Sequence, residues 1–211
     1  MGLILVGLDR DGTINHDPGH FGKQDNWKEI LKIYDGVIEG IKLLNKNQDI
    51  KVIVATNQGG VARGYYNTKR VKEINKTIND LLSKQGAIIH NWQYCPYFDE
   101  ITAEKKKYPL SEFILKNNDI RVRLMKPNIG MLEQAAKEMG YSLIDFEKIY
   151  FLGDKVEDVL LGLNAGGKGI MVKKGAYPEE IERFKQLINP GAISTETFLE
   201  AVNYVINDIS I

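Results

Sequence analysis

The sequence predicts an α/β protein in which a parallel β-sheet is covered by helices on both faces. Short runs of aliphatic and β-branched residues alternate with longer segments whose apolar residues recur at helical spacing. The first run, Leu3–Leu8, is continuously apolar, which is typical of a strand buried on both faces. Because strands and helices alternate along the whole chain, we expect right-handed βαβ units.

The first half of the chain contains three segments with the length and composition of strands. They cover residues 3–8, 51–55 and 87–94. Two helices are expected between them, one over residues 35–45 and one that begins near Thr68, a plausible N-cap. Both segments have apolar residues three and four positions apart, which places these side chains on one helix face.

The second half continues the alternation of helices and strands. Strands are predicted over residues 149–152 and 169–173, with a short one over residues 192–194. Helices are predicted over residues 127–139, 156–165, 179–188 and 196–205.

Segments 16–33 and 95–123 fit no regular element. Both exceed the ~4–6 residues typical of connections in compact domains, and long loops often form lids or binding loops. Their aromatic residues, such as Trp27 and Tyr97, could line a substrate mouth or simply pack the loops onto the body. Since no repeat or low-complexity linker divides the chain, we predict a single domain over residues 1–211 with substrate loops near 16–33 and 95–123.

The composition excludes several classes of protein. Lys plus Arg and Asp plus Glu each number 28, hydrophobic residues make up 43%, and there is one cysteine. A disordered chain would be less apolar, and one cysteine cannot form an internal disulfide. No apolar run approaches the ~18 residues of a membrane span, and zero net charge removes the simplest argument for a nucleic-acid partner. We expect a cytoplasmic monomer with no membrane contact.

Two aspartates directly follow the first predicted strand. Asp9 and Asp11 lie one residue apart, so their carboxylates face the same side if the chain stays extended. One could act as a nucleophile and the other as an acid or base. Gly12 allows a tight turn that would bring backbone amides near a bound anion. A solvated Asp-Gly turn would, however, give the same local sequence.

Two further polar segments could bind a phosphoryl group. Thr56 and residues 57–59 (Asn-Gln-Gly) follow the second strand, and a hydroxyl group with glycine-loosened amides suits phosphoryl oxygens. Lys126 precedes Pro127, which favours an extended lysine whose ammonium group could reach a site as a point charge. Taken singly, each segment is also typical of an ordinary turn or of a surface lysine.

An acidic segment follows the fourth predicted strand. Asp154 lies at the strand end, and Asp158 lies one helical turn further on the same side. Mg²⁺ in proteins is usually bound by one or two carboxylates together with water and substrate phosphate. The segment therefore predicts a magnesium site, although an acidic first helical turn is also favoured by the helix dipole.

Together the four segments resemble the haloacid dehalogenase-like phosphohydrolase superfamily. The similarity extends from Leu3 to about Lys174, and four segments are also similar to the heptose-1,7-bisphosphate phosphatase and histidinol-phosphatase subfamily: Asp-Arg-Asp-Gly-Thr (9–13), Thr-Asn-Gln-Gly-Gly (56–60), Lys-Pro-Asn-Ile-Gly-Met (126–131) and Gly-Asp-Lys (153–155). The resemblance implies a Rossmann-like, haloacid dehalogenase-like fold without a large cap domain.

The resemblance also implies a role for each matching residue. Asp9 would be the nucleophile that forms an aspartyl-phosphate, and Asp11 the acid and base. Thr56 and the amide of Asn57 would hold the phosphoryl group, and Lys126 would neutralise its charge. Mg²⁺ would be bound by Asp9, the Asp11 carbonyl and Asp154, with Asp158 ordering a metal-bound water or Lys155. The substrate-contacting positions correspond to Asp17, His20, Asn57, Gln58, Gly59 and Lys155.

Two departures from the subfamily pattern concern a zinc site and substrate recognition. The usual zinc ligands are a Cys-x-His and a later Cys-x-Cys, but here only Cys95 is retained, and the other positions hold Tyr97, Val122 and Leu124. One ligand cannot hold zinc tetrahedrally, so no zinc is predicted. The arginine that usually precedes the Lys-Pro pair and recognises substrate is Met125.

The expected function is Mg²⁺-dependent hydrolysis of a small phosphorylated metabolite, most simply a sugar phosphate or bisphosphate such as heptose 1,7-bisphosphate. Histidinol-phosphate phosphatase activity is one alternative. Nucleic-acid 3′-phosphatase activity is another, since that catalytic domain has a similar Thr-Asn-Gln segment, but zero net charge opposes it. A signalling receiver module is rejected because its acceptor aspartate ends a middle strand, and a silent binding module is disfavoured because every catalytic position is filled.

Overall fold

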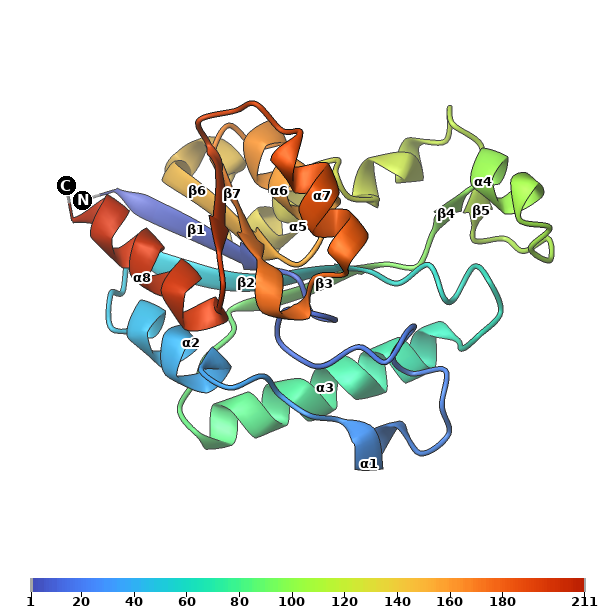
Figure 1. Cartoon of the computed structure of the whole chain (residues 1–211), viewed down its shortest axis with the longest axis horizontal. Helices are drawn as coiled ribbons and strands as arrows, with labels where there is room; N and C mark the ends of the chain where they lie inside the picture. The colour runs from blue at the N-terminus through green and yellow to red at the C-terminus, as the bar shows by residue number, and fades with distance from the viewer. Residues whose placement is uncertain (1, 211) are drawn as a thin grey trace.

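The computed structural model describes residues 2–210 and contains a six-stranded sheet in the order β3-β2-β1-β6-β7-β8. Every neighbouring pair in this sheet is parallel, so the carboxyl ends of all its strands lie at one edge (Figure 1). The predicted α/β class and parallel sheet are confirmed. The strands are β1 (Leu3–Leu8), β2 (Ile50–Asn57), β3 (Asn91–Cys95), β6 (Phe146–Gly153), β7 (Lys168–Val172) and β8 (Ala192–Thr195).

Helices cover both faces of the sheet. They are α1 (Trp27–Ile30), α2 (Val37–Asn45), α3 (Thr68–Lys84), α4 (Glu100–Lys105), α5 (Gly130–Glu138), α6 (Val156–Asn164), α7 (Pro178–Lys185) and α8 (Phe198–Ile209). Figure 1 shows α2, α3 and α8 on one side of the sheet and α5 and α6 on the other. None of the helices within residues 2–210 combines the length and apolar character that a membrane span requires.

The alternation of side chains along β1 explains the two layers. Ile4, Val6 and Leu8 point into the larger core, which contains apolar residues of α2, α3 and α8. Leu5 points to the opposite face and joins the core formed with α5 and α6. Because successive residues of a strand face opposite sides, a strand that is buried on both faces must be apolar at every position. The continuous apolar run predicted this burial correctly.

Several predicted boundaries were wrong for identifiable reasons. β3 begins at Asn91 rather than at residue 87, because Ala87 and Ile89 are buried in the preceding connection without joining the sheet. The N-cap of α3 is Asn67, whose side chain accepts a hydrogen bond from the Arg70 amide, so Thr68 is already helical. The helix predicted from residue 127 begins at Gly130, because a turn closed by the Asn128 amide and the Met125 carbonyl precedes it.

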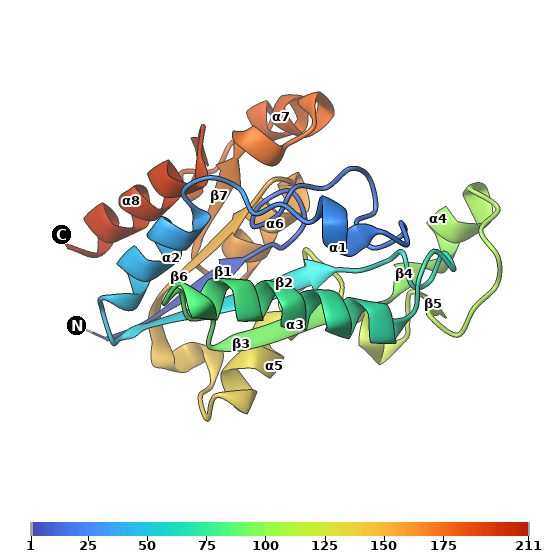
Figure 2. The same cartoon turned by 90° about the horizontal axis from the view of Figure 1, so that it is seen from below.

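The two segments without predicted structure both contain short elements. Segment 16–33 includes the single-turn helix α1, and segment 95–123 includes β4 (Phe98–Asp99), α4, β5 (Ile114–Leu115) and a 3₁₀ turn over Ile120–Leu124. β4 and β5 pair in parallel as a separate two-stranded sheet. In Figures 1 and 2 the α4, β4 and β5 region lies beyond the carboxyl ends of β2 and β3. Elements of two to six residues are too short to show a sequence period.

Candidate active site

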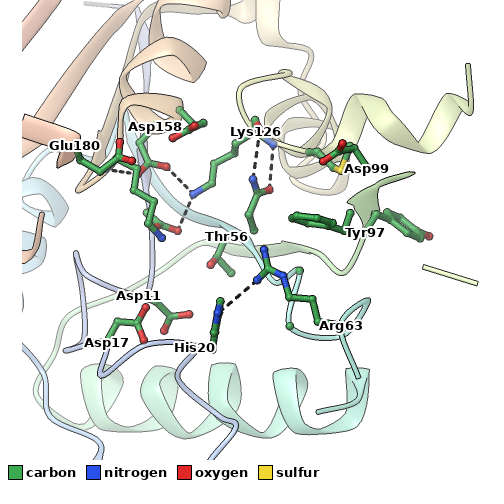
Figure 3. Close-up of a pocket in the computed structure, with 18 of the residues that line it drawn as sticks. Asp11, Asp17, His20, Thr56, Arg63, Tyr97, Asp99, Lys126, Asp158 and Glu180 are labelled. Atoms are coloured by element: carbon green, nitrogen blue, oxygen red, sulfur yellow. Dashed lines mark hydrogen bonds and ion pairs between the residues drawn. The ribbon is translucent and has the colours of Figure 1, made fainter. Parts of the chain in front are cut away.

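The carboxyl edge of the sheet brings the predicted motifs around one cavity of about 580 Å³ (Figure 3). Asp9 follows β1, Thr56 lies near the end of β2, and Asp154 follows β6. Most predicted site residues line this cavity: Asp9, Asp11, Asp17, His20, Thr56, Asn57, Gly59, Lys126, Lys155 and Asp158. Gln58 and Asp154, each 1% exposed, do not line it and lie buried in the wall.

Lys126 lies between two carboxylates at the inner end of the cavity. Its ammonium nitrogen is 2.7 Å from Asp9 Oδ1 and 2.6 Å from Asp158 Oδ1, and all three side chains are buried. Burial lowers the pKa of Lys126, but the carboxylates of Asp158 and Asp9 outweigh this effect and hold the pKa above its ordinary value. The lysine is therefore charged.

Asp9 is ionised in this environment. Burial alone would raise its pKa, but the neighbouring ammonium groups of Lys126 and Lys155 hold the pKa below its ordinary value. The carboxylate is thus in the ionised form that a nucleophile requires, at the end of a strand whose backbone is fixed by pairing with both β2 and β6.

Three buried carboxylates form a candidate cation site. One oxygen from each of Asp9, Asp154 and Asp158 lies within 4.8 Å of the others. Burial, followed by repulsion from Asp9 and Asp158, raises the pKa of Asp154 even though Lys155 opposes the shift. Three hard oxygen ligands that repel one another in a buried cluster are suited to a divalent cation such as Mg²⁺.

Position 12, beside this cluster, requires a glycine. Its φ is +92°, and a Cβ atom there would lie 2.3 Å from Asp154 Oδ2, so only glycine fits beside the aspartate. The predicted tight turn is present. The Gly12 amide, however, donates a hydrogen bond to the Asn15 carbonyl at 2.8 Å. It is therefore already used within the turn and does not face a bound anion.

Asp11 is held by a network that the sequence did not reveal. Arg10 donates from Nε to Asp11 Oδ1 at 2.9 Å and from Nη2 to Oδ2 at 2.6 Å, which is a bidentate pair. Arg10 is fully buried, and its Nη1 donates to Asn75 of α3 at 2.7 Å. Asn15 donates to Oδ1 at 3.1 Å. One signal was available, because Asn75 is a polar residue next to the apolar stripe of α3.

Gln58 and Asn57 position other site residues. Gln58 Nε2 donates to Asp11 Oδ2 at 2.8 Å and is 2.9 Å from Thr56 Oγ1, so it links the two catalytic candidates. The Asn57 side chain accepts a hydrogen bond from the Lys126 amide at 3.0 Å and donates one to the Lys126 carbonyl at 3.4 Å. These contacts join the end of β2 to the Lys126 segment.

The segment after β6 organises two charged groups. Asp158 Oδ2 accepts a hydrogen bond of 3.0 Å from the Lys155 amide, while its Oδ1 contacts Lys126. The Lys155 side chain lines the cavity. Burial lowers its pKa, but Asp154 and Asp9 outweigh this effect and keep the ammonium group charged. The Asp158 carboxylate therefore contacts both lysine residues, at the ammonium group of Lys126 and at the backbone amide of Lys155.

Cys95 is a buried thiol in the core between the sheet and α5. Burial raises its pKa to about 12, so the thiolate form that binds zinc is disfavoured. That environment suits a small apolar residue. The expectation that the chain binds no zinc stays a prediction.

Several known phosphatases are similar to this chain in sequence. A HAD-hydrolase-like family model matches residues 124–201. The D-glycero-beta-D-manno-heptose-1,7-bisphosphate 7-phosphatase of Haemophilus influenzae is 36% identical over 80% of this chain and 80% of its own length. The enzyme of the same name from Pasteurella multocida is 32% identical over 96% of this chain and 91% of its own length.

Solved structures share the fold. The heptose 1,7-bisphosphate phosphatase from B. bronchiseptica, complexed with magnesium and phosphate, has a TM-score of 0.72 at 22% identity and covers 98% of this chain and 99% of its own. A putative HAD-like phosphatase from Mesorhizobium loti has a TM-score of 0.72 at 24% identity and covers 99% of this chain and 88% of its own. The haloacid dehalogenase-like fold predicted from the motifs is thus confirmed. Given relatives more than 30% identical along most of both sequences, this chain is a haloacid dehalogenase-like phosphatase that belongs to the D-glycero-D-manno-heptose-1,7-bisphosphate 7-phosphatase family.

Proposed function

We propose that this chain removes one phosphate from a sugar bisphosphate, with heptose 1,7-bisphosphate as the first candidate, through an aspartyl-phosphate on Asp9. The observation that supports this most strongly is the buried Asp9–Lys126–Asp158 arrangement at the inner end of the cavity. It places an ionised carboxylate beside a fixed positive charge, which is what attack on a phosphoryl group requires.

In the first step, a carboxylate oxygen of Asp9 attacks phosphorus, and the bond from phosphorus to the sugar oxygen breaks. Asp11 gives the leaving oxygen a proton. In the second step, Asp11 takes a proton from water, the water oxygen bonds to phosphorus, and the bond to Asp9 breaks. Lys126, Thr56 and the Asn57 amide stabilise the charge on the phosphoryl oxygens in both steps. Arg10 and Gln58 keep Asp11 in place between them.

The chain offers a set of oxygen ligands for Mg²⁺. The Asp9 and Asp154 carboxylates and the Asp11 carbonyl would bind the ion, and the Asp158 carboxylate of the same cluster would add negative charge beside it. When bound, the ion would supply positive charge to the phosphoryl oxygens. The solved structure of the B. bronchiseptica protein, complexed with magnesium and phosphate, supports the choice of metal.

Removing divalent metal should abolish activity and lower thermal stability. Because Asp9, Asp154 and Asp158 repel one another in the metal-free protein, EDTA treatment should lower the melting temperature. It should also stop hydrolysis of p-nitrophenyl phosphate, because the positive charge that the ion would supply to the phosphoryl oxygens is lost. Adding Mg²⁺ should restore turnover and raise the melting temperature with increasing concentration, as binding to the folded state requires. A melting temperature that does not respond to Mg²⁺, together with full activity in EDTA, would disprove the metal assignment.

A substrate panel tests the proposed reaction. We expect kcat/KM to be highest for heptose 1,7-bisphosphate when it is compared with histidinol phosphate, nucleoside monophosphates and 3′-phosphorylated oligonucleotides. The physical reason is that the cavity combines an inner phosphoryl site with polar walls and a volume suited to a small ligand. Faster hydrolysis of 3′-phosphorylated DNA that falls steeply with salt would favour a nucleic-acid phosphatase instead.

A further inference from the structure

The mouth of the cavity contains an arginine that the proposed chemistry does not use. Arg63 lies in the turn after β2, where its amide donates to the Gly59 carbonyl at 3.1 Å. Its side chain lines the same cavity as Asp9 and Lys126. Figure 3 shows the Arg63 guanidinium directed toward the middle of the cavity, at a separate position from Lys126 and next to His20.

The Arg63 guanidinium is fixed by aromatic rings. Its central carbon lies 4.3 Å from the centre of the Phe98 ring and 5.3 Å from that of Tyr108. Phe98 belongs to β4, and Tyr108 follows α4, so the small second sheet provides this support. Packing against a ring face holds a guanidinium while leaving the donors in its plane available to a ligand.

Most donors of Arg63 have no protein partner. Among residues 2–210, its Nε is buried without a hydrogen bond, and the guanidinium makes a single polar contact, from Nη1 to His20 Nδ1 at 3.4 Å. Because buried donors are nearly always paired, an unpaired one next to a cavity indicates a ligand that supplies acceptors. Guanidinium groups fit phosphate oxygens in both charge and geometry.

His20 adds a donor to the same position. A guanidinium has no acceptor, so the His20 Nδ1 that contacts it must accept, which places the proton of the neutral ring on Nε2. Burial lowers the pKa of His20, and the charges of Arg63 and Lys155 lower it further. Two positively charged side chains, Arg63 and Lys155, thus act on this histidine.

The carboxylates in the cavity wall have other partners. Asp99 caps α4, and Asp17 accepts two backbone amides of its own loop. Glu157 and Glu180 both form ion pairs with Arg183, at 3.0 and 2.7 Å. None of these four has an ion pair with Arg63 among residues 2–210. Arg63 consequently remains free to bind an external anion.

We propose that Arg63 and His20 form a second anion subsite, which binds the phosphate that the enzyme does not cleave. This inference rests on the proposed function, because a bisphosphate needs two phosphate sites. Lys126 and the phosphoryl-binding groups occupy the inner end, and Met125, which also lines the cavity, has no charge. Arg63 supplies the cation for the other end of the substrate and thereby selects bisphosphates over monophosphates.

The subsite predicts a selective effect of Arg63→Met. The value of kcat/KM for heptose 1,7-bisphosphate should fall roughly 10- to 100-fold, as expected for loss of a charge-assisted hydrogen-bonding group. Turnover of p-nitrophenyl phosphate, which has no second phosphate, should change less than about twofold. Arg63→Lys should retain part of the selectivity because it keeps the charge but loses the planar fork. Equal losses with both substrates would overturn the proposal.

Arg121→Met is the matched control. Arg121 is also an arginine beside an aromatic ring, 5.1 Å from the centre of Tyr97, but it already pairs with Asp119 at 2.7 Å and does not line the cavity. Its replacement should leave the ratio of the two kcat/KM values unchanged. A loss of selectivity equal to that of Arg63→Met would mean that the surface charge near the mouth, rather than a subsite, determines the preference.

A binding measurement separates this inference from the proposed reaction. Calorimetric titration of heptose 1,7-bisphosphate into the Asp9→Asn protein should give an affinity that falls roughly 10- to 100-fold when Arg63→Met is added. If the wild-type protein hydrolyses no phosphomonoester but the binding still depends on Arg63, the function is wrong and the subsite stands. No detectable binding, or equal affinity with and without Arg63, overturns the subsite.

Discussion

Replacing Asp9 with asparagine should lower turnover of phosphomonoesters at least about 10³-fold, the scale of loss typical when a nucleophile is removed. Asparagine has nearly the same shape as aspartate, but its amide cannot form an acyl phosphate by displacing the sugar oxygen. Steady-state hydrolysis of p-nitrophenyl phosphate with saturating Mg²⁺ measures the effect. Activity within tenfold of the wild type would exclude Asp9 as the nucleophile.

Asp25→Asn is the matched control for this change. Asp25 is a fully exposed aspartate whose nearest ion-pair partner, Arg70, is 3.9 Å away. Its replacement should leave both activity and melting temperature unchanged, since exposed pairs contribute little. Circular dichroism of the Asp9→Asn protein should match the wild type, because β1 is fixed by its pairing with β2 and β6 and not by the Asp9 carboxylate.

Replacing Lys126 with methionine should affect both activity and stability. The change leaves Asp9 and Asp158 buried without the ammonium group that now lies 2.7 and 2.6 Å from them. Loss of one partner from a buried ion pair typically costs about 3–5 kcal/mol of unfolding free energy. The value of kcat should also fall at least about 10²-fold, because a positive charge on the phosphoryl oxygens is lost. Thermal melting and steady-state kinetics measure the two effects.

Lys126→Arg separates the two contributions. It keeps a positive charge among the carboxylates and should recover most of the stability, but its wider, planar head group should not restore activity. Lys137→Met, on the outer part of α5, is a control for loss of a lysine that has no ion pair among residues 2–210. A Lys126→Met protein with wild-type melting temperature would mean that Asp9 and Asp158 do not depend on this lysine for stability.

The sequence predicted the inner end of the site because strand ends can be recognised locally. Asp9 follows a continuous apolar run, Thr56 follows another, and parallel strands bring their carboxyl ends together. No tertiary contact needs to be known for this argument. The grouping of Asp9, Asp154 and Asp158 then follows from the order of strands, because β1 lies next to β6.

Contacts between distant segments could not be predicted in this way. Arg10 and Asn75 are 65 residues apart and meet only because α3 packs into the same core as the side chains of β1. Arg63 is fixed by Phe98 and Tyr108, which belong to a segment whose elements are too short to show a period. In both cases the role of the residue depends on its tertiary surroundings, which neither residue type nor spacing reveals.

The most direct test of the account is chemical trapping of the phosphorylated residue. Borohydride reduces an acyl phosphate to an alcohol, so quenching the enzyme with borohydride during turnover should convert the phosphorylated aspartate to homoserine. Peptide mass spectrometry should then locate homoserine at Asp9 and only in samples that contain substrate and Mg²⁺. Homoserine at Asp11 or Asp154, or full turnover with no modified aspartate, would contradict the proposed intermediate.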